Sequence, residues 1–600
     1  MEIRSPRGNA VGTRVDRKLS SWRVRRHAAA IVLGLASLAV AATTVSSPPP
    51  GAARDRTPIA EELADSCPGT YPTWFGQPAW VIGCHIGGQA FTSPVVGSID
   101  GQKVVVDASL SGEVYVVNAL TGKELPGWPQ RATLTGDTAT AIDSSPAIAY
   151  LDGPSAEPSI VVGLGSQYVK DQNGGVMAWN ANGTVRFRFL TKKTFSQWGG
   201  PADYTNSVFA TPAIGDLTGN GQQDIVFGSF DHYVYALNPS GKLLPGFPIN
   251  RADTIWSSPS LVDVTHTGKM DIIEGGDATG LKGTNGVPCY SGWVSDYRYY
   301  DNAPHLIWER CLAETVWSSP AVTMFGSTPV VVVGTSWFYG PGRDVKPAED
   351  EIFAFNAANG DLMKGWPVNT GGATIGSPAV GPAVPGGPTE VFESSCQNCP
   401  DSGDAIVTAW SQSGRELWRT NITTYGELLS SPTLANVTDR SSGGLSSNDV
   451  LIGNVAGLYV LNAENGHKVA GTGTKPIDPG CYVGGAPPVA YVPGSATGWM
   501  LFTNCGFAGS TTVNNFLRAF NIPAPASAPP WPMFRGNPQR TGVADPLSAP
   551  AVSCSTPTSP SGYRLFTGAG HVYGYGGSHF CGSMATEALP APVAGVASTP

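Results

Sequence analysis

An all-β fold is the class that the sequence predicts, from its composition and from an internal repeat. Gly contributes 75 and Pro 51 of the 600 residues, whereas charged residues make up only 14%. This balance suits many short strands joined by tight turns, and no long helical periodicity follows the N-terminus. Units with the same internal order of short apolar segments recur along most of the chain, which is a second and independent indication.

Residues 206–250 are the clearest copy of this unit, with four short strands separated by Gly and Asn turn signals. Copies begin at a Ser-Ser-Pro-like phrase and follow one another at intervals of about fifty to sixty residues. A four-stranded sheet cannot bury both faces alone, and radial packing of such sheets solves this problem. The sequence therefore predicts a β-propeller of eight four-stranded antiparallel blades, with seven as the alternative because the last copy is faint. The eight starts are Pro94, Pro146, Pro212, Pro259, Pro320, Pro378, Pro432 and Pro487.

An aromatic residue closes the fourth strand of several copies. We expect each ring to lie between neighbouring blades, where burial contributes about 2–3 kcal/mol. These rings are Trp128, Phe247, Trp308, Trp366 and Trp418.

The first 41 residues have the pattern of a secretory signal peptide. Basic residues, including Arg25 and Arg26, precede an apolar run from Ala28 to Ala42 that ends in an Ala-Val-Ala site. The run is shorter than the ~20 residues of a membrane span. We expect a secreted or cell-surface protein without a membrane span after signal removal. An uncleaved anchor is the alternative, and general secretory and twin-arginine export both stay open.

The net charge of the chain limits the classes of molecule that it can bind. Removing residues 1–41 takes away eight basic and two acidic side chains and moves the net charge from −9 to −15. An acidic surface argues against nucleic acid and anionic lipid as partners. We expect a monomer that binds protein or glycan.

Five segments follow from these patterns: a signal peptide (1–41), a linker with an N-terminal disulfide segment (42–90), the propeller (91–543), a Pro/Ser/Ala-rich linker (544–560) and a small β-rich module (561–600). Ten cysteines in an exported chain predict disulfides between near neighbours. The expected pairs are Cys67–Cys84, Cys289–Cys311, Cys396–Cys399, Cys481–Cys505 and Cys554–Cys581.

Several phrases resemble known families. Residues 118–128 and 356–366, which run from Asn to Trp through Gly turns, resemble the tryptophan-docking repeats of PQQ-like (quinoprotein) β-propellers. The Asp216–Asp224 loop resembles the FG-GAP (VCBS) repeats of integrin-type propellers. Residues 531–542 resemble a phrase common at the closing end of secreted propellers, and residues 562–600 resemble one GYW-type repeat of secreted actinobacterial proteins. The resemblance implies the propeller fold and little about activity.

The Asp216–Asp224 loop is the candidate metal site. Calcium prefers several hard oxygens on a short turn that a Gly allows to bend. The resemblance implies ligands at Asp216, Thr218, Asn220, Gln222 (by its carbonyl) and Asp224, with Gly221 at the bend. Only two carboxylates remain in this set, and a plain turn with side chains bonded to their own backbone is the alternative. A weaker candidate is the next copy, with Asp263, Thr265, Thr267, Lys269 and Asp271.

Expanded loops between second and third strands, at 166–174, 277–305, 336–351 and 394–404, predict a binding rim opposite the calcium loop. Aromatic rings in these loops suit glycan or protein contacts, unless they only pack the loops down. The candidate binding residues are Tyr290, Trp293, Tyr297, Trp337, Phe338 and Tyr339.

Function is the least determined feature. No catalytic constellation is visible, and no adjacent Cys-Cys pair or haem-attachment motif supports a PQQ enzyme. We expect a binding or scaffold module for glycan or protein, with a weak structural calcium loop. The alternative is an extracellular enzyme, either a quinone-dependent dehydrogenase or a hydrolase, with its site in the propeller funnel. Convergent carboxylates or His in the funnel would favour the enzyme, whereas a plugged funnel would favour binding.

Overall fold

The computed structural model describes residues 78–86, 92–136, 138–166, 173–192, 206–251, 253–277, 281–282, 288–289, 291–336, 350–397, 404–423, 430–438, 447–454, 457–469, 483–505, 515–523, 525, 528–544, 563–566 and 572–575. In these residues all regular structure is strand, and no helix is long and apolar enough to cross a membrane.

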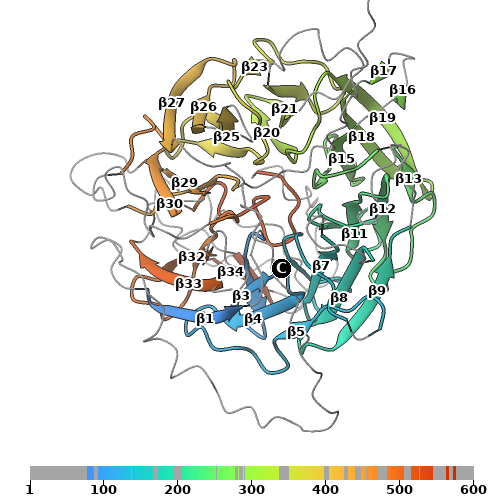
Figure 1. The fold of residues 1–600 in the computed structure, drawn as a ribbon, viewed down its shortest axis with the longest axis vertical. Coiled ribbons are helices and arrows are strands. Elements are labelled where there is room, and N and C mark those ends of the chain that lie inside the picture. The colour runs from blue at the N-terminus through green and yellow to red at the C-terminus, as the bar shows by residue number, and fades with distance from the viewer. Residues whose placement is uncertain are drawn as a thin grey trace, which may run out of the picture. The chain divides into compact units, whose positions relative to one another are not determined.

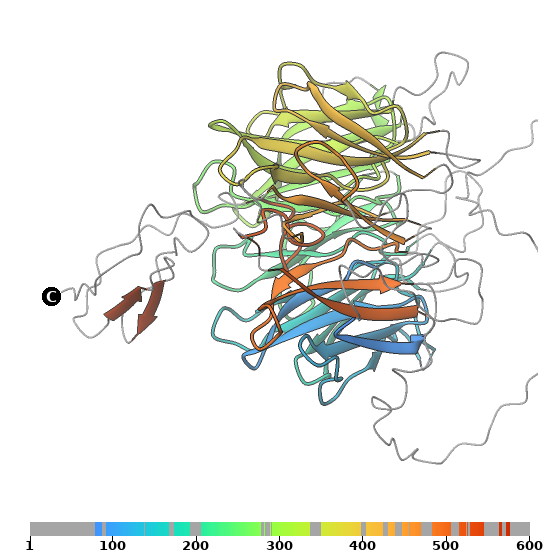
Figure 2. The same cartoon turned by 90° about the vertical axis from the view of Figure 1, so that its left-hand side faces the viewer.

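Eight antiparallel sheets form the blades of a propeller, which confirms the predicted fold and the larger of the two blade counts (Figure 1). Seven sheets have four strands, and the seventh blade has three in the described part of the chain. Each blade runs in order from an inner strand, which follows the Ser-Pro phrase, to an outer one (Figure 1), and Figure 2 shows the propeller from the side.

The first four blades contain the following strands. Blade one has β2 (Val95–Ile99), β3 (Gln102–Ala108), β4 (Glu113–Asn118) and β5 (Gln130–Arg131); blade two has β6 (Ala147–Ala149), β7 (Ser159–Leu164), β8 (Gly175–Asn180) and β9 (Val185–Leu190). Blade three has β10 (Ala213–Gly215), β11 (Asp224–Gly228), β12 (Tyr233–Leu237) and β13 (Ile249–Asn250). Blade four has β14 (Ser260–Val262), β15 (Asp271–Asp277), β18 (Gly292–Tyr300) and β19 (Ala303–Leu312), with the small sheet β16 (Leu281–Lys282) and β17 (Pro288–Cys289) between its second and third strands.

The other four blades complete the ring. Blade five has β20 (Ala321–Phe325), β21 (Thr328–Gly334), β22 (Glu351–Asn356) and β23 (Val368–Asn369); blade six has β24 (Ala379–Pro382), β25 (Thr389–Gln397), β26 (Asp404–Trp410) and β27 (Glu416–Thr423). Blade seven has β28 (Thr433–Ala435), β29 (Asp449–Asn454) and β30 (Gly457–Asn462). Blade eight has β31 (Val489–Tyr491), β32 (Trp499–Cys505), β33 (Asn515–Ile522) and β1 (Trp80–Ile86). A separate two-stranded sheet has β34 (Tyr563–Phe566) and β35 (Val572–Tyr575).

The N-terminal strand β1 closes the ring. It pairs antiparallel with β33, so that Trp80 lies opposite Ala519 and Ile82 opposite Leu517. The propeller therefore begins before residue 91, where the sequence placed its start. Nothing local marks Trp80–Ile86 as part of a repeat, because its three partner strands lie at the other end of the chain.

The Ser-Pro phrases form a belt of hydrogen bonds between blades. In each link, a backbone N–H donates to the hydroxyl of the equivalent residue in the next blade. This explains why Ser or Thr recurs before the Pro, since a buried N–H needs an acceptor. The links join Ser93 to Ser145 (2.9 Å), Ser145 to Thr211 (3.1 Å), Thr211 to Ser258 (2.9 Å), Ser258 to Ser319 (2.9 Å), Ser319 to Ser377 (3.0 Å), Ser377 to Ser431 (2.9 Å) and Ala486 to Ser93 (2.9 Å).

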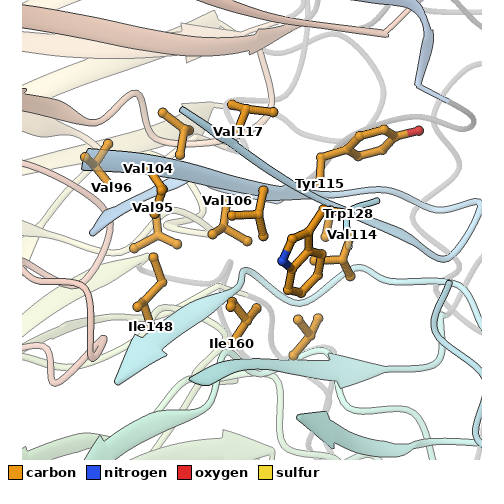
Figure 3. Packing of buried hydrophobic residues seen from close by; sticks show 14 of the residues in the cluster. Val95, Val96, Val104, Val106, Val114, Tyr115, Val117, Trp128, Ile148 and Ile160 are labelled. Atoms are coloured by element: carbon orange, nitrogen blue, oxygen red, sulfur yellow. The ribbon is translucent and has the colours of Figure 1, made fainter. Parts of the chain in front are cut away.

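The closing aromatics are buried between blades, as the sequence predicted. Figure 3 shows Trp128 of blade one against Ile160 of blade two, within a shared apolar cluster. Its indole N–H donates to the carbonyl of Ala181 in blade two (2.8 Å). Trp80 makes the same bond to Ala119 (2.9 Å) in the next blade. The same arrangement holds for Trp308 on Ala357 (2.8 Å), Trp366 on Gln412 (3.0 Å) and Trp418 on Ala463 (2.7 Å).

Candidate functional site

The Asp216–Asp224 loop is a tight hairpin turn between β10 and β11. The Asp216 carboxylate accepts backbone N–H groups of Gly219 (2.7 Å), Asn220 (3.1 Å) and Gly221 (2.7 Å). Gly221 has φ +83°, so it does make the bend that the sequence assigned to it. The amides of the loop thus already hold one of its two carboxylates.

The second carboxylate of this loop, that of Asp224, is mostly buried and accepts the N–H of Leu217 (3.1 Å). Burial raises the pKa of Asp224 to about 6, and the nearby charge of Asp216 adds to the rise. Among the described residues, no three His, Cys, Asp or Glu side chains gather as a metal-binding set. The loop has the geometry of a turn whose side chains bond their own backbone, since Asn220 also accepts the N–H of Gln222 (2.8 Å), and calcium binding here stays a prediction.

The second loop, Asp263–Asp271, does not fit calcium. Arg298 forms a bidentate ion pair with Asp271, with Nε and Nη2 at 2.6 and 3.1 Å from its oxygens. The Asp263 carboxylate accepts the N–H groups of Thr267 (3.0 Å) and Gly268 (2.6 Å). The guanidinium of Arg298 supplies the positive charge that a calcium ion would bring. A salt bridge therefore takes the place of the calcium site that was predicted for this loop.

Two of the predicted rim aromatics are buried. Trp293 is fully buried with Arg251 stacked over its ring at 3.8 Å, and Tyr297, also buried, accepts a hydrogen bond from Arg251. Both belong to β18, so the second half of the expected loop at 277–305 is strand β18 and the start of β19. These rings pack blade four and do not form a binding surface. Tyr290, Trp337, Phe338 and Tyr339 lie outside the described residues.

Cysteine states agree with the expected oxidation. Cys311 and Cys396 are disulfide-bonded, and no cysteine among the described side chains is free. The pairing itself stays a prediction.

Residues 529–544 lie on the axis of the ring and include the phrase 531–542 that the sequence placed at the closing end. Its backbone carbonyls accept N–H groups from the inner strands of six blades. The bonds run from Ile148 to Pro538 (2.9 Å), Ile214 to Gln539 (3.0 Å), Leu261 to Thr541 (3.0 Å), Val322 to Gly542 (2.8 Å), Leu434 to Trp531 (2.9 Å) and Val489 to Pro532 (2.8 Å). We call this segment the plug.

Two fully buried arginines hold the plug in place. Arg540 donates to the carbonyls of Pro146 (2.9 Å), Ser93 (2.7 Å) and Pro94 (3.1 Å), which joins blades one and two. Arg535 donates to the carbonyls of Pro259 (2.8 Å) and of Pro320 in blades four and five. The Pro carbonyls of the repeat thus accept hydrogen bonds from the plug.

Carboxylates on second strands lie beneath the surface around this plug. Asp107, Glu274 and Glu393 occupy equivalent positions in blades one, four and six, and each is at most 1% exposed. Burial raises the pKa of Asp107 to about 7 and the pKa of Glu274 well above its usual value, although Arg540 and Arg535 oppose these rises. A substrate cannot reach these groups directly, so they do not form an active site.

An aromatic arc lies in the connections that lead into blades three, four and five, at the end of the propeller that we call the mouth. Phe209, Trp256 and Trp317 stand at the same repeat position, immediately before the Ser-Pro phrase of blades three, four and five. Ring centroids of Phe209 and Trp256 are 5.1 Å apart, and those of Trp256 and Trp317 are 4.5 Å apart. Phe230 packs against Trp256 at 4.5 Å. The sequence contained this signal, but it appears only when the residue before each phrase is compared across blades.

Two carboxyl groups, those of Asp253 and Asp277, lie beside the aromatic arc. Asp277 accepts the indole N–H of Trp317 (3.0 Å) and the hydroxyl of Thr254 (2.8 Å). Burial raises the pKa of Asp277 well above its usual range, and the charge of Asp253 raises it further, while bonds from Thr254, Trp317 and Trp256 oppose this. Asp253 is 8% and Asp277 7% exposed. The mouth therefore combines partly exposed rings with two adjacent acceptors.

Neither a protein-family model nor a curated protein matches the chain. Several solved structures do. BamB from Moraxella catarrhalis is 13% identical (TM-score 0.43; 74% of this chain, 97% of that one), and the V. cholerae biofilm matrix protein Bap1 is 12% identical (TM-score 0.48; 78% and 97%). Quinohemoprotein alcohol dehydrogenase from Comamonas testosteroni is 12% identical (TM-score 0.46; 75% and 77%). This likeness is one of fold, not of function.

Proposed function

We propose that this chain is an exported binding module that receives its ligand at the mouth of the funnel, on the rim of the blade connections. The plug carries the proposal. In the described part of the chain, residues 529–544 accept hydrogen bonds from six inner strands, so the backbone of the plug occupies the axis where reactive groups would have to surround a substrate. The signal-like N-terminus supports export, and the rigid ring suits presentation of a binding surface.

A quinone cofactor does not fit the described part of the mouth. PQQ is a planar tricarboxylate and needs cationic partners, whereas the titratable groups described beside the arc are the carboxyl groups of Asp253 and Asp277. Arg251, a cation of the same rim, is already held by Glu309, Ser295 and Tyr297. The donor set therefore favours a neutral or hydroxyl-rich ligand.

The proposal includes calcium at the Asp216–Asp224 loop, on the opposite rim, with a structural role. Asp216 and Asp224 would supply the charge, and Thr218, Asn220 and the carbonyl of Gln222 the neutral oxygens. Burial and, to a smaller extent, the charge of Asp216 raise the pKa of Asp224, and a divalent cation would stabilise the ionised form that they disfavour. Calcium should raise the melting temperature of the wild type and not of Asp224→Asn. No shift at millimolar calcium would contradict this part of the proposal.

The binding function is tested with the fluorescently labelled mature protein, residues 42–600, on bacterial envelopes and on printed glycans and proteins. We expect saturable binding without conversion of the bound material. Tyr491→Ala serves as the control and should bind like wild type. It removes an exposed ring at the end of β31, at a repeat position other than that of the arc. Absence of binding to every surface, or steady release of cleaved or oxidised product, would overturn the proposal.

A further inference from the structure

The aromatic arc has an outer and an inner layer. Phe209 and Trp256 are partly exposed, whereas Phe230 and Trp317 are buried beneath or beside them. Trp317 is nearly parallel to Trp256, with an interplanar angle of 21°, and Phe230 is tilted against it by 48°. Phe230 and Trp317 therefore pack against Trp256 and restrict the orientation of its ring. Such exposed and supported rings are a ready surface for an apolar ligand face.

The carboxylate of Asp277 fixes the edges of this surface. It accepts the indole N–H of Trp317 at 3.0 Å, and hydrogen bonding from Trp256 stabilises its charged form. Thr254 donates to its second oxygen at 2.8 Å. Two indoles from neighbouring blades are thus oriented by one acidic group, which makes Asp277 a positioning residue for the arc.

The polar groups at the arc favour a donor of hydrogen bonds. The raised pKa of Asp277 makes it the group of this pair that holds a proton, and the remaining carboxyl oxygens of the pair can accept hydrogen bonds from ligand hydroxyls. Asp253 and Asp277 are buried with 8% and 7% of their surface exposed, so a ligand hydroxyl would meet them only at this exposed edge. An anionic ligand would meet repulsion from the negative charge that this pair of carboxyl groups retains. A ligand with one apolar face and a rim of neutral hydroxyls meets both requirements.

A pyranose ring has this combination, since its axial C–H groups form an apolar face and its hydroxyls project from the edge. We propose that the arc of Phe209 and Trp256, together with Asp253 and Asp277, is a carbohydrate subsite that takes a neutral hexose unit of a glycan. This inference rests on the proposed binding function and names its ligand class. The ring stacks on Trp256, and its hydroxyls donate to the carboxylates.

Titration of neutral oligosaccharides (gluco-, manno- and galacto-configured tetraoses) into the mature protein tests the subsite, with indole fluorescence and calorimetry as readouts. Wild type should bind at least one series in the micromolar to millimolar range. Trp256→Ala should weaken binding at least tenfold, and Trp256→Phe should restore part of it. Asp253→Asn should weaken binding several-fold, and the control Tyr491→Ala should leave the affinity unchanged.

Folding is checked by melting temperature, and Trp256→Phe and Asp253→Asn carry the test if Trp256→Ala does not fold. Sialylated or uronic-acid oligosaccharides should bind at least tenfold more weakly than their neutral counterparts. The subsite is wrong if envelope or array binding persists while no neutral saccharide binds, or if Trp256→Ala and Tyr491→Ala bind alike. If wild type binds none of the surfaces in the envelope and array experiment, the proposed function itself fails.

Discussion

Arg540→Ala is the substitution that most severely perturbs the closed axis. Arg540 is fully buried and donates to four backbone carbonyls, those of Pro146, Ser93, Pro94 and Phe534, at 2.7–3.1 Å. Alanine leaves these acceptors without their donor in a site that solvent does not reach. A loss of about 1 kcal/mol for each carbonyl gives a decrease of about 4 kcal/mol in the free energy of unfolding. Burial lowers the pKa of Arg540, which shows that its charge is unfavourable in this site. Removal of this buried charge offsets a part of the decrease in the free energy of unfolding.

Urea unfolding followed by tryptophan fluorescence measures this decrease. Arg131→Ala, which removes an exposed arginine on β5, is the matched control and should change the free energy by less than about 0.5 kcal/mol. Arg540→Lys keeps the charge but not the planar fork, so its effect should lie between the two. A decrease for Arg540→Ala that equals the Arg131→Ala value would refute the claim that the plug holds blades one and two together.

Three further predictions follow from the ring. Ala486→Ser should add the missing link of the belt by accepting the N–H of Ser431, and raise the free energy of unfolding by about 1 kcal/mol in the same assay; no gain would mean that the hydroxyl cannot reach. Trp80→Ala should lower it by about 2 kcal/mol because its indole N–H bonds Ala119 across the closure, whereas an unchanged midpoint would show that β1 is dispensable. Burial raises the pKa of Asp107 from 3.8 to about 7, so the folded chain retains a proton between pH 4 and 7 that the unfolded chain loses. Stability should therefore fall as pH rises through this window, and Asp107→Asn should flatten the profile; a parallel profile would contradict the assignment.

Local patterns allowed much of the fold to be predicted. The Ser-Pro phrase and the closing Trp lie within one repeat, and their burial and spacing follow from strand alternation. Strand β1 could not be found this way, because its pairing with β33 joins residues from opposite ends of the chain. The plug was visible as a phrase, but its position on the axis depends on contacts with six blades at once.

The site was harder to predict, for physical reasons that particular residues show. Trp293, Tyr297 and Tyr299 are separated by even numbers of residues along β18, and this two-residue period places them on one face of a strand. The prediction of a binding loop at 277–305 rested on the aromatic residues of this segment and not on their two-residue period. The arc of Phe209 and Trp256 required comparison across repeats, since neighbouring blades bring the rings together and local sequence does not.

Amide hydrogen exchange resolved to single residues tests the closed axis most directly. The N–H groups of the inner strands that donate to the plug should be strongly protected in the intact mature protein, to the level of the second strands. These groups belong to Ile148, Ile214, Leu261, Val322, Leu434 and Val489. Fast exchange of these six amides, with the second strands still protected, would show an open axis. That result would contradict the claim that the plug closes the axis, and the funnel would again be a candidate catalytic site.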